Sequence, residues 1–308
     1  MISILLKTLP FFALIGVGYL AGRSRMFPQE GVAWLTKFVF YFALSAMLFR
    51  FAANLSLADI FDPTFVMAYL SASLVLYLLV LGVATIRGRG IEEAAMEAQC
   101  AQSGNTGFLG VPMLVVLLGP AAAGPVLMVL TVDMVVFSSL FTLIITGARG
   151  GALGRHALRS LAIGWLKNPM VVSIVLGLIW SAWALPVPGP VNEFLSLLGG
   201  AATPGALFAI GASLAGRGAE RLGVASWLSF AKLILHPLLV AIAALWLFPV
   251  EREAAGVMIA AASLPVAGNV YILAQHYGVA PQRVSTAILI STAASIVTVT
   301  TVIAWIKG

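Results

Sequence analysis

The sequence is poor in charged residues, which make up 9% of its 308 positions, whereas 61% are hydrophobic. A soluble domain carries about 25% charged and 45–50% apolar residues, so a water-soluble fold is excluded. Cysteine is nearly absent because Cys100 stands alone, which excludes a disulfide framework or a cysteine metal cluster within one chain. The net charge of +6 comes without any basic cluster interleaved with aromatic residues, so nucleic acid is not an expected partner.

Motifs of ATP-driven pumps and of hydrolases are missing or incomplete. The sequence has no GxxxxGK[ST] loop, no HExxH metal motif and no run that resembles a cofactor box. The stretch 211–215, Gly-Ala-Ser-Leu-Ala, approaches the G-x-S-x-G nucleophile elbow but lacks the final glycine. An intramembrane serine hydrolase that uses Ser213, with His236 as its base, is therefore kept as an alternative and not as the leading hypothesis.

Long apolar stretches of about 20 residues recur along the whole chain, and each can cross a hydrocarbon core of about 30 Å as a helix. Stretches 65–85 and 224–248 stay apolar on every face, unlike the alternating strands of a membrane barrel. The first stretch is followed by Arg23 and Arg25 and lacks a cleavage site of small residues, so it is a span and not a signal peptide. We predict an all-α polytopic membrane protein with ten spans, at about residues 3–22, 31–53, 63–87, 92–118, 122–147, 166–185, 191–216, 224–248, 252–277 and 282–306.

Basic residues accumulate on one side of these ten spans. The loops that follow odd-numbered spans hold Arg23, Arg25, Arg87, Arg89, Arg149, Arg155, Arg159, Lys167, Arg217, Arg221 and Arg283. The opposite side has only Lys7, Arg50, Arg252 and Lys307 near its edges. Because lysine and arginine concentrate on the cytoplasmic side, both termini are expected outside the cytoplasm, in a bacterial inner membrane.

The longest connection, 148–164, is rich in glycine and arginine and follows the fifth span. It divides the chain into a first five-helix repeat at 1–150, a cytoplasmic linker at 151–165 and a second repeat at 166–308. Because five is odd, the second repeat would be inverted relative to the first. Short sequence echoes favour this arrangement over chance likeness: Pro10 and Gly18 match Pro169 and Gly177, 43–49 matches 202–208, and 93–95 matches 253–255.

The fourth span contains a polar run at 99–112 that suits neither lipid nor a regular helix. Each interior glycine costs roughly 1 kcal/mol, Pro112 removes a backbone donor, and the amides and hydroxyls need partners. A break that faces a cavity solves these problems, and the freed N–H groups of a half-helix then attract an anion. Pro265, Gly268 and Asn269 repeat the pattern in the ninth span. Two kinks in ordinary packed helices are the alternative.

Four segments resemble the auxin efflux carrier family, which includes bacterial malonate carriers and is related to the plant PIN-formed carriers. They are 104–112, Lys167-Asn168-Pro169, 204–214 and 263–278. The resemblance implies ten helices in two inverted repeats, a scaffold domain and a transporter domain, and broken fourth and ninth helices that cross near the midplane. It also places the carboxylate-binding asparagine of the family on Asn105.

Two departures from the family pattern change the expected geometry. Ser45 stands where family members carry a proline, so a break is expected in the seventh span at Pro204 but is absent or softer in the second. A second proline of the plant pattern is replaced by Val270 or a neighbour, which leaves the crossover position in the ninth helix open.

Three sets of candidate site residues follow from these observations. The expected substrate-binding residues are Gln102, Ser103, Gly104, Asn105, Thr106, Gly268 and Asn269, and the expected helix breaks are at Pro112, Pro204 and Pro265. Asp133 and Glu97 are the candidates for ion coupling, because a charge inside a span is costly and must face an interior or an aqueous path.

Each ionisable residue within a span also has a structural alternative. Asp133 either binds a coupling proton or cation, or pairs with Lys232. Glu97 is expected near the surface, in a solvated or capping role rather than in coupling. His236 is expected to be a hydrogen-bonded structural residue rather than a proton shuttle.

The sequence thus predicts a secondary-active transporter that moves small organic anions by alternating access. Mono- or dicarboxylates such as malonate or auxin-like acids are the expected substrates, and no cofactor is expected beyond a coupling proton or sodium ion. A channel or sensor that shares the fold is a further alternative. The oligomeric state is open, with a homodimer as one option.

Overall fold

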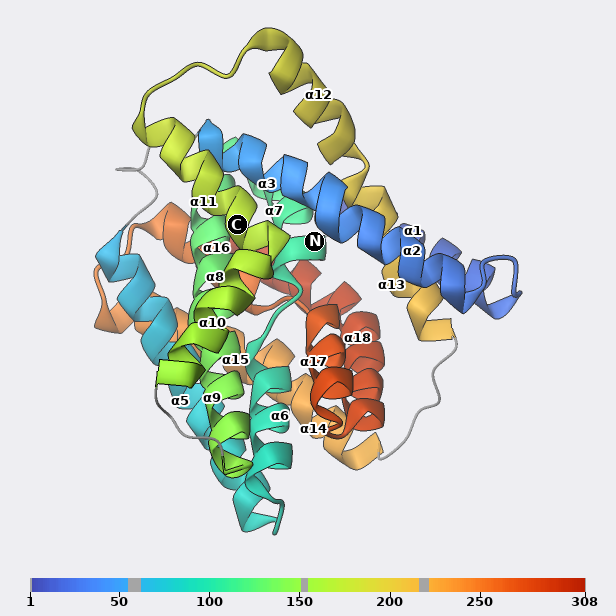
Figure 1. Ribbon diagram of the computed structural model, residues 1–308, viewed down its shortest axis with the longest axis vertical. Coiled ribbons are helices and arrows are strands. Elements are labelled where there is room, and N and C mark those ends of the chain that lie inside the picture. The colour runs from blue at the N-terminus through green and yellow to red at the C-terminus, as the bar shows by residue number, and fades with distance from the viewer. Residues whose placement is uncertain (1, 55–61, 151–154, 216–221, 308) are drawn as a thin grey trace.

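The computed structural model describes residues 2–54, 62–150, 155–215 and 222–307, which form helices joined by short connections (Figure 1). Six of these helices are long and apolar enough to cross a membrane, and a seventh span results if the bent pair Leu161–Lys167 and Pro169–Ala182 is counted as one. The described residues hold no strand beyond one isolated bridge. The chain is therefore an all-helical multi-pass membrane protein.

The observed elements begin and end within a few residues of the predicted spans, and several spans are divided into shorter pieces, where η marks a π or 3-10 turn. In chain order they are α1(Ile2–Arg23), α2(Gln29–Phe38), η1(Val39–Ala43), α3(Leu44–Ala53), α5(Pro63–Ile86), α6(Ile91–Gln102), η2(Thr106–Gly110), α7(Val111–Leu118), η3(Pro120–Ala122), α8(Ala123–Val132), η4(Asp133–Phe137), α9(Ser138–Ala148), α10(Arg155–Lys167), α11(Pro169–Ala182), α12(Gly189–Gly200), α13(Ala202–Ala215), α14(Leu222–Phe230), η5(Ala231–Leu235), α15(His236–Ile242), η6(Ala243–Leu247), α16(Arg252–Ala262), α17(Gly268–Tyr277) and α18(Pro281–Lys307).

Part of the predicted cytoplasmic linker at 151–165 is helical. Residues 151–154 lie outside the described residues, but Arg155–Lys167 forms helix α10, which meets α11 at an angle of 78°. Asn168 causes the bend, because its side chain accepts hydrogen bonds from the backbone N–H groups of Met170 and Val171 and caps a new helix. Pro169 then occupies the first helical position, where a missing N–H costs nothing.

The break expected at Pro204 lies at a different residue in the structure. Helix α12 ends at Gly200 and α13 begins at Ala202, so the interruption falls at Ala201 and Pro204 lies in the first turn of the next helix. Proline is tolerated in a first turn because the N–H groups there have no partner within the helix. The second span has no such break: a π turn at η1 leads into α3, and the Ser45 hydroxyl donates to the Phe40 carbonyl.

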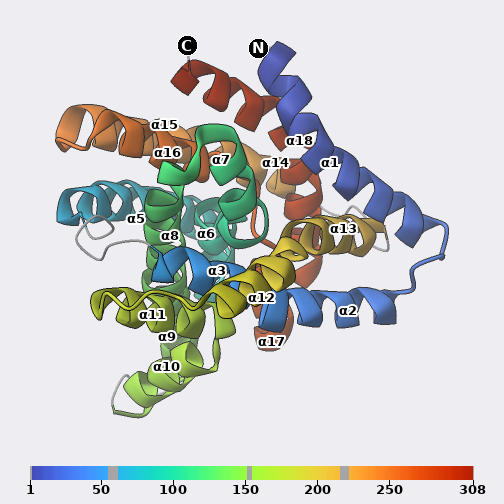
Figure 2. The same ribbon diagram turned by 90° about the horizontal axis from the view of Figure 1, so that it is seen from above.

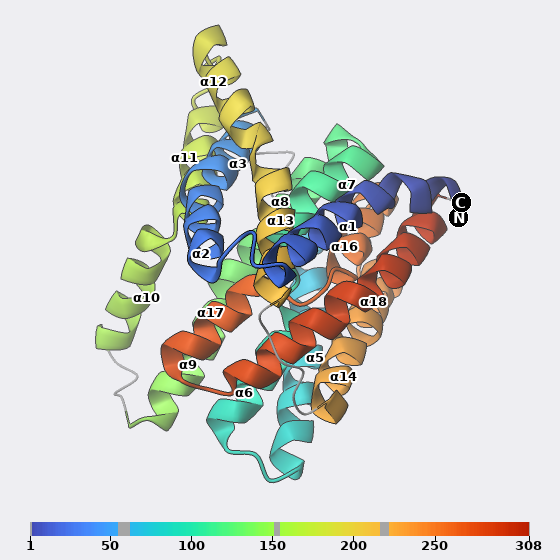
Figure 3. The ribbon, with the colours of Figure 1, turned by 90° about the vertical axis from the view of Figure 1, so that its right-hand side faces the viewer.

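Helices α1, α2, α3, α11, α12 and α13 pack together into one group, named the framework here. Figure 3 shows α2, α3, α11 and α12 along one side of the molecule, with α1 and α13 crossing beside the remaining helices. Gly18 of α1 packs against the Phe208 carbonyl of α13, and Gly177 of α11 packs against the Phe49 carbonyl of α3. Small residues allow such close backbone approach inside a membrane.

Gly18 gives a direct test of this close packing. A methyl group on Gly18 would overlap the Phe208 backbone carbonyl, whereas one on Gly16 of the same helix would meet nothing within 4 Å. We expect Gly18→Ala to destabilise the protein by about 1–3 kcal/mol, the cost typical of overpacking. Gly16→Ala is the matched control and should leave stability unchanged or raise it slightly. Thermal unfolding in detergent measures both, and equal midpoints would contradict the packing.

Helices α5 to α9 and α14 to α18 form the second group, named the core group here, and α10 contacts α11 of the framework and α9 of the core group. An ion-pair cluster joins the ends of its helices. Glu97 of α6 is 1% exposed, accepts a hydrogen bond from Arg283 Nη1 at 2.6 Å and also pairs with Arg87. Arg149 donates to Glu92 and to the Tyr277 carbonyl, which ends α17. The expectation of Glu97 near the surface is therefore wrong, because two distant arginines neutralise its charge and allow its burial.

The helices that carry the two ends of the chain lie side by side. Figure 2 shows the first turns of α1 next to the last turns of α18, and the hydroxyls of Thr8 and Thr300 are 3.1 Å apart. An even number of spans between them would give this arrangement, since each span reverses the side of the chain.

Candidate functional site

Two helices of the core group are interrupted, and the two interruptions pair with each other. Between α6 and η2 the chain is extended at 103–105, and between α16 and α17 it is non-helical at 263–267. The Asn105 N–H donates to the Pro265 carbonyl at 2.8 Å, and the Ala267 N–H donates to the Ser103 carbonyl at 3.0 Å. This antiparallel bridge between Gly104 and Val266 satisfies backbone groups that lipid could not.

Lys232 stabilises the end of α16, where the second paired segment begins. Its side chain is fully buried, and Nζ donates to the Ala262 carbonyl at 2.7 Å, which is the last carbonyl of α16. A cation is favourable at a helix C-terminus, where the macrodipole is negative. A Cβ atom on Gly104 would lie 3.1 Å from Nζ, so a larger residue there would press against the lysine side chain.

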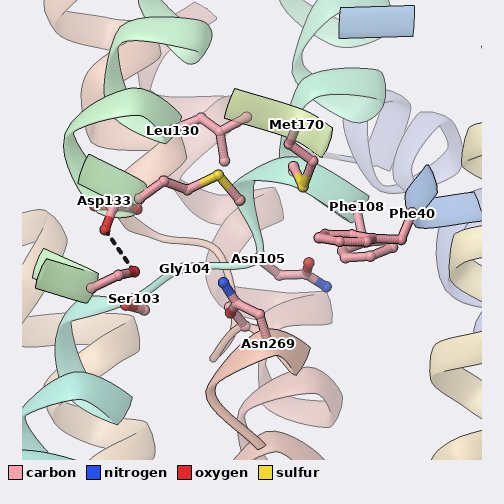
Figure 4. A pocket seen from close by; sticks show the side chains of 13 residues that line it. Phe40, Ser103, Gly104, Asn105, Phe108, Leu130, Asp133, Met170 and Asn269 are labelled. Carbon is pink, nitrogen blue, oxygen red and sulfur yellow. Dashed lines mark hydrogen bonds between the residues drawn. The ribbon is translucent and has the colours of Figure 1, made fainter. Parts of the chain in front are cut away.

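Two cavities lie against the paired segments, and both are lined by Asn105, Phe108 and Asn269. The first adds Asp133 and Met170 to its wall. Figure 4 shows Asn105 and Asn269 close together below the Met170 side chain, with Asp133 on the opposite side of the extended segment. The second is larger and extends between α13 and α17. The two cavities therefore share one asparagine from each of the interrupted helices.

The side chain of Asn105 is available for a ligand. Asn105 precedes η2 at the capping position, yet its side chain makes no capping hydrogen bond there. Its carbonyl already accepts from the N–H groups of Leu109 and Gly110. The Oδ1 atom of Asn269 is buried and has no hydrogen-bond partner among the described residues. The side-chain amides of Asn105 and Asn269 are therefore available to a ligand in the two cavities that both residues line.

The first turn of α17 adds backbone donors to this site. Helix α17 begins at Gly268, and the residue before it, Ala267, has no side chain able to cap the helix. The N–H groups of a first helical turn have no partners within the helix and carry a partial positive charge. Such a terminus beside two neutral amides can hold a carboxylate.

Asp133 is held by hydrogen bonds and not by an ion pair. Its Oδ1 atom accepts from Tyr69 at 2.8 Å and from Gln102 Nε2 at 2.5 Å. Within the described part of the chain, its carboxylate has no cation within 4 Å, and its Oδ2 atom has no hydrogen-bond partner. The direct pairing with Lys232 that the sequence left open is thus absent, because Lys232 bonds to Ala262 and His236 instead.

The other predicted residues are divided between the cavities and their surroundings. Ser103, Gly104 and Asn105 line the first cavity, Gly268 lines the second, and Asn269 lines both. Gln102 is turned to Asp133, the Thr106 hydroxyl is buried without a partner among the described residues, and Glu97 lies in the ion-pair cluster. Pro265 lies within the interruption, whereas Pro112 lies in the first turn of α7.

The residues of the hydrolase alternative do not come together. The Ser213 hydroxyl donates to the Ile210 carbonyl at 2.8 Å. His236 is buried between the Ser73 hydroxyl at 2.9 Å and Lys232 at 2.7 Å. A serine nucleophile needs its base within hydrogen-bond reach, and His236 bonds to Ser73 and Lys232 instead of Ser213.

Several residues around the site were not predicted from the sequence. Tyr69 holds Asp133, and the ring of Phe40 stacks on that of Phe108 at 6.4 Å between the framework and the core group. A tyrosine and a phenylalanine in an apolar span carry no signal that separates them from packing residues. Lys232 did carry a signal, since a lysine in the middle of an apolar span must find a partner.

Comparison with known proteins agrees with this architecture. Residues 3–303 match the membrane transport protein family. A protein of Rhizobium meliloti (strain 1021) named "Putative malonate transporter" is 30% identical over 296 residues, which cover 95% of this chain and 92% of that protein. The "Uncharacterized transporter YfdV" of Escherichia coli (strain K12) is 26% identical over 300 residues, covering 94% of this chain and 93% of that protein. The chain therefore belongs to the membrane transport protein family of the auxin efflux carriers and is a membrane transporter, not an enzyme.

Proposed function

We propose that this protein is a secondary-active transporter that moves small organic anions, mono- or dicarboxylates such as malonate or auxin-like acids, by alternating access. The observation that carries the proposal is the pairing of two interrupted helices beside a cavity that two uncommitted asparagine amides share. Interrupted helices whose half-helix ends face a cavity are the usual substrate sites of secondary transporters.

The proposed architecture is ten spans in two inverted repeats, 1–150 and 166–308. Contacts between the repeats support it. Gly18 and Gly177 are related by the same sequence offset as Phe49 and Phe208. Gly18 of the first repeat contacts Phe208 of the second, and Gly177 of the second repeat contacts Phe49 of the first. A pseudo-twofold axis between inverted repeats produces such exchanged contacts.

The proposed orientation places both termini outside the cytoplasm of a bacterial inner membrane. The ion-pair cluster supports it, because Arg87, Arg149 and Arg283 come from the ends of three helices, α5, α9 and α18, and lie at one end of the core group. Arginine concentrates on the cytoplasmic side, so this end would face the cytoplasm.

Substrate recognition would use neutral donors and one helix terminus. The amide of Asn105 and the first N–H groups of α17 donate to the carboxylate, while the amide of Asn269 completes its surroundings. Neutral groups bind an anion less tightly than a buried ion pair does. Weaker binding suits a carrier, because a carrier must also release its substrate. The name of the Rhizobium relative refers to malonate, which supports a carboxylate here.

Energy would come from a proton or sodium gradient through Asp133. Its free Oδ2 atom and its place in the cavity wall support this role. A carboxylate in the membrane interior that has no cationic partner is costly when ionised, so binding a proton or a cation there would be linked to the state of the neighbouring site.

Counterflow in proteoliposomes tests the proposed function. Vesicles loaded with an unlabelled carboxylate should accumulate the same labelled carboxylate transiently, because a carrier exchanges bound substrate across the membrane. Malonate, succinate, acetate and indole-3-acetate form a suitable panel. Flux that never saturates and shows no counterflow would indicate a channel, and no flux of any carboxylate would refute the proposal.

A further inference from the structure

A third cavity lies between the framework and the core group. It holds about 440 Å³. The framework contributes α1, α3, α12 and α13, and the core group contributes Pro112, Val115 and Val116 of α7. Helix α7 continues the interrupted helix that carries Asn105, so one wall of this cavity belongs to the same broken span as the candidate substrate site.

Arg50 is the only charged residue among the described residues that line this cavity. Its Nε atom donates to Asn192 Oδ1 at 2.9 Å, which fixes the plane of the guanidinium group. Within the described residues, no carboxylate lies within 4 Å of it. The two terminal nitrogens of the fork are therefore left for another partner, and the hydroxyl-bearing Ser196 and Thr203 line the same wall.

A guanidinium fork with neighbouring hydroxyls matches the geometry of a carboxylate. Arginine binds carboxylates through two parallel N–H···O bonds, which are stronger than bonds between neutral groups. The remaining wall is apolar, with Phe11, Met47 and Phe51 among its residues. Such a wall lowers the local dielectric and strengthens the attraction of the arginine for an anion.

The third cavity lies next to the second along α13. Thr203 lines the third, whereas Ala206 and Ile210 line the second. Three residues of a helix span about 4.5 Å, so the two cavities border α13 within one helical turn of each other. Arg50 lies at the end of the second predicted span, which is the non-cytoplasmic end in the proposed orientation.

We propose that Arg50, together with Ser196 and Thr203, forms an outer anion site that receives the carboxylate from, and releases it to, the non-cytoplasmic side. This inference rests on the proposed function. It adds that Arg50 sets the affinity for the carboxylate on the non-cytoplasmic face only. Asn192 is a positioning residue for Arg50.

The experiment measures transport from each face separately, with right-side-out and inside-out membrane vesicles and labelled malonate as the probe. Arg50→Gln removes the charge and keeps a polar side chain of similar length. We expect KM from the outer face to rise by about tenfold, which corresponds to the loss of one charge-assisted interaction, and KM from the cytoplasmic face to stay unchanged. Arg50→Lys should give an intermediate outer KM, because it keeps the charge without the fork.

Asn192→Leu is the matched control, since it removes the hydrogen bond between α3 and α12 but leaves the guanidinium group. A smaller rise in outer KM than that of Arg50→Gln supports the anion site. If Asn192→Leu reproduces the full effect of Arg50→Gln, or if both faces change equally, Arg50 is a structural brace and the outer site is refuted.

Three further outcomes separate the remaining explanations. If the effect of Arg50→Gln appears in vesicles that contain anionic phospholipid and disappears in vesicles without it, the arginine binds a lipid headgroup and the outer site is refuted. Wild-type transport with an unchanged outer KM in Arg50→Gln refutes the outer site alone. A wild-type protein that moves no carboxylate refutes the proposed function and the outer site together.

Discussion

Replacing Asn105 by alanine is expected to weaken binding of the carboxylate substrate strongly while the protein stays folded. The amide faces the two cavities and makes no capping hydrogen bond, so its loss breaks no interaction in the structure. A hydrogen bond to a charged group contributes about 1.5–3 kcal/mol, which corresponds to an affinity about 10- to 100-fold lower. A scintillation proximity assay or ligand-induced thermal stabilisation measures this change.

Ser213→Ala serves as the control for Asn105→Ala. Ser213 also lines the second cavity, but its hydroxyl already donates to the Ile210 carbonyl. Its removal should leave substrate affinity close to that of the wild type. Unfolding temperatures without ligand should agree among the three proteins. An Asn105→Ala variant with wild-type affinity would show that the substrate binds elsewhere.

Replacing Asp133 by asparagine is expected to uncouple transport from the ion gradient. Asparagine has the same shape and keeps an oxygen for the bonds from Tyr69 and Gln102, but it cannot bind a proton and holds a cation weakly. Coupling to one proton under a gradient of about one pH unit supports about tenfold accumulation of substrate. The variant should lose this accumulation and keep counterflow, which needs no net coupling.

Tyr69→Phe is the matched comparison for Asp133→Asn. It removes one hydrogen bond to the same oxygen and retains the carboxylate. Accumulation should therefore persist in Tyr69→Phe, with an altered dependence on pH or on the cation. If Asp133→Asn still accumulates substrate when a proton or sodium gradient is imposed, Asp133 has only a structural role.

The interruptions of the two helices could be located from sequence, because glycine, proline and uncapped amides are poor choices for a helix in lipid. Asn105 and Asn269 were singled out on that basis, and both line the cavities. Prolines located the interruptions less well. Pro112 and Pro204 lie just after them, since a proline is compatible with the first turn of a helix and so marks a start.

Partners of buried charges could not be found from sequence. Glu97 is buried because Arg283, from the last helix, reaches it. Asp133 bonds to Tyr69 and Gln102 and not to Lys232. A sequence shows that a charge within a span requires a partner, but several residues on several helices can satisfy that requirement.

The sequence by itself determined that the chain lies in a membrane, where its spans fall, which connections carry positive charge and where two helices stop being stable in lipid. These properties are local, because transfer of a segment from water to lipid depends on the side chains of that segment. The tertiary structure alone decided that the two interruptions pair, that Lys232 supports them, and that Arg50 meets Asn192 beside α7. Those contacts join residues that are far apart in the chain. They form because the helices pack closely, and small residues such as Gly18 and Gly177 allow this close packing.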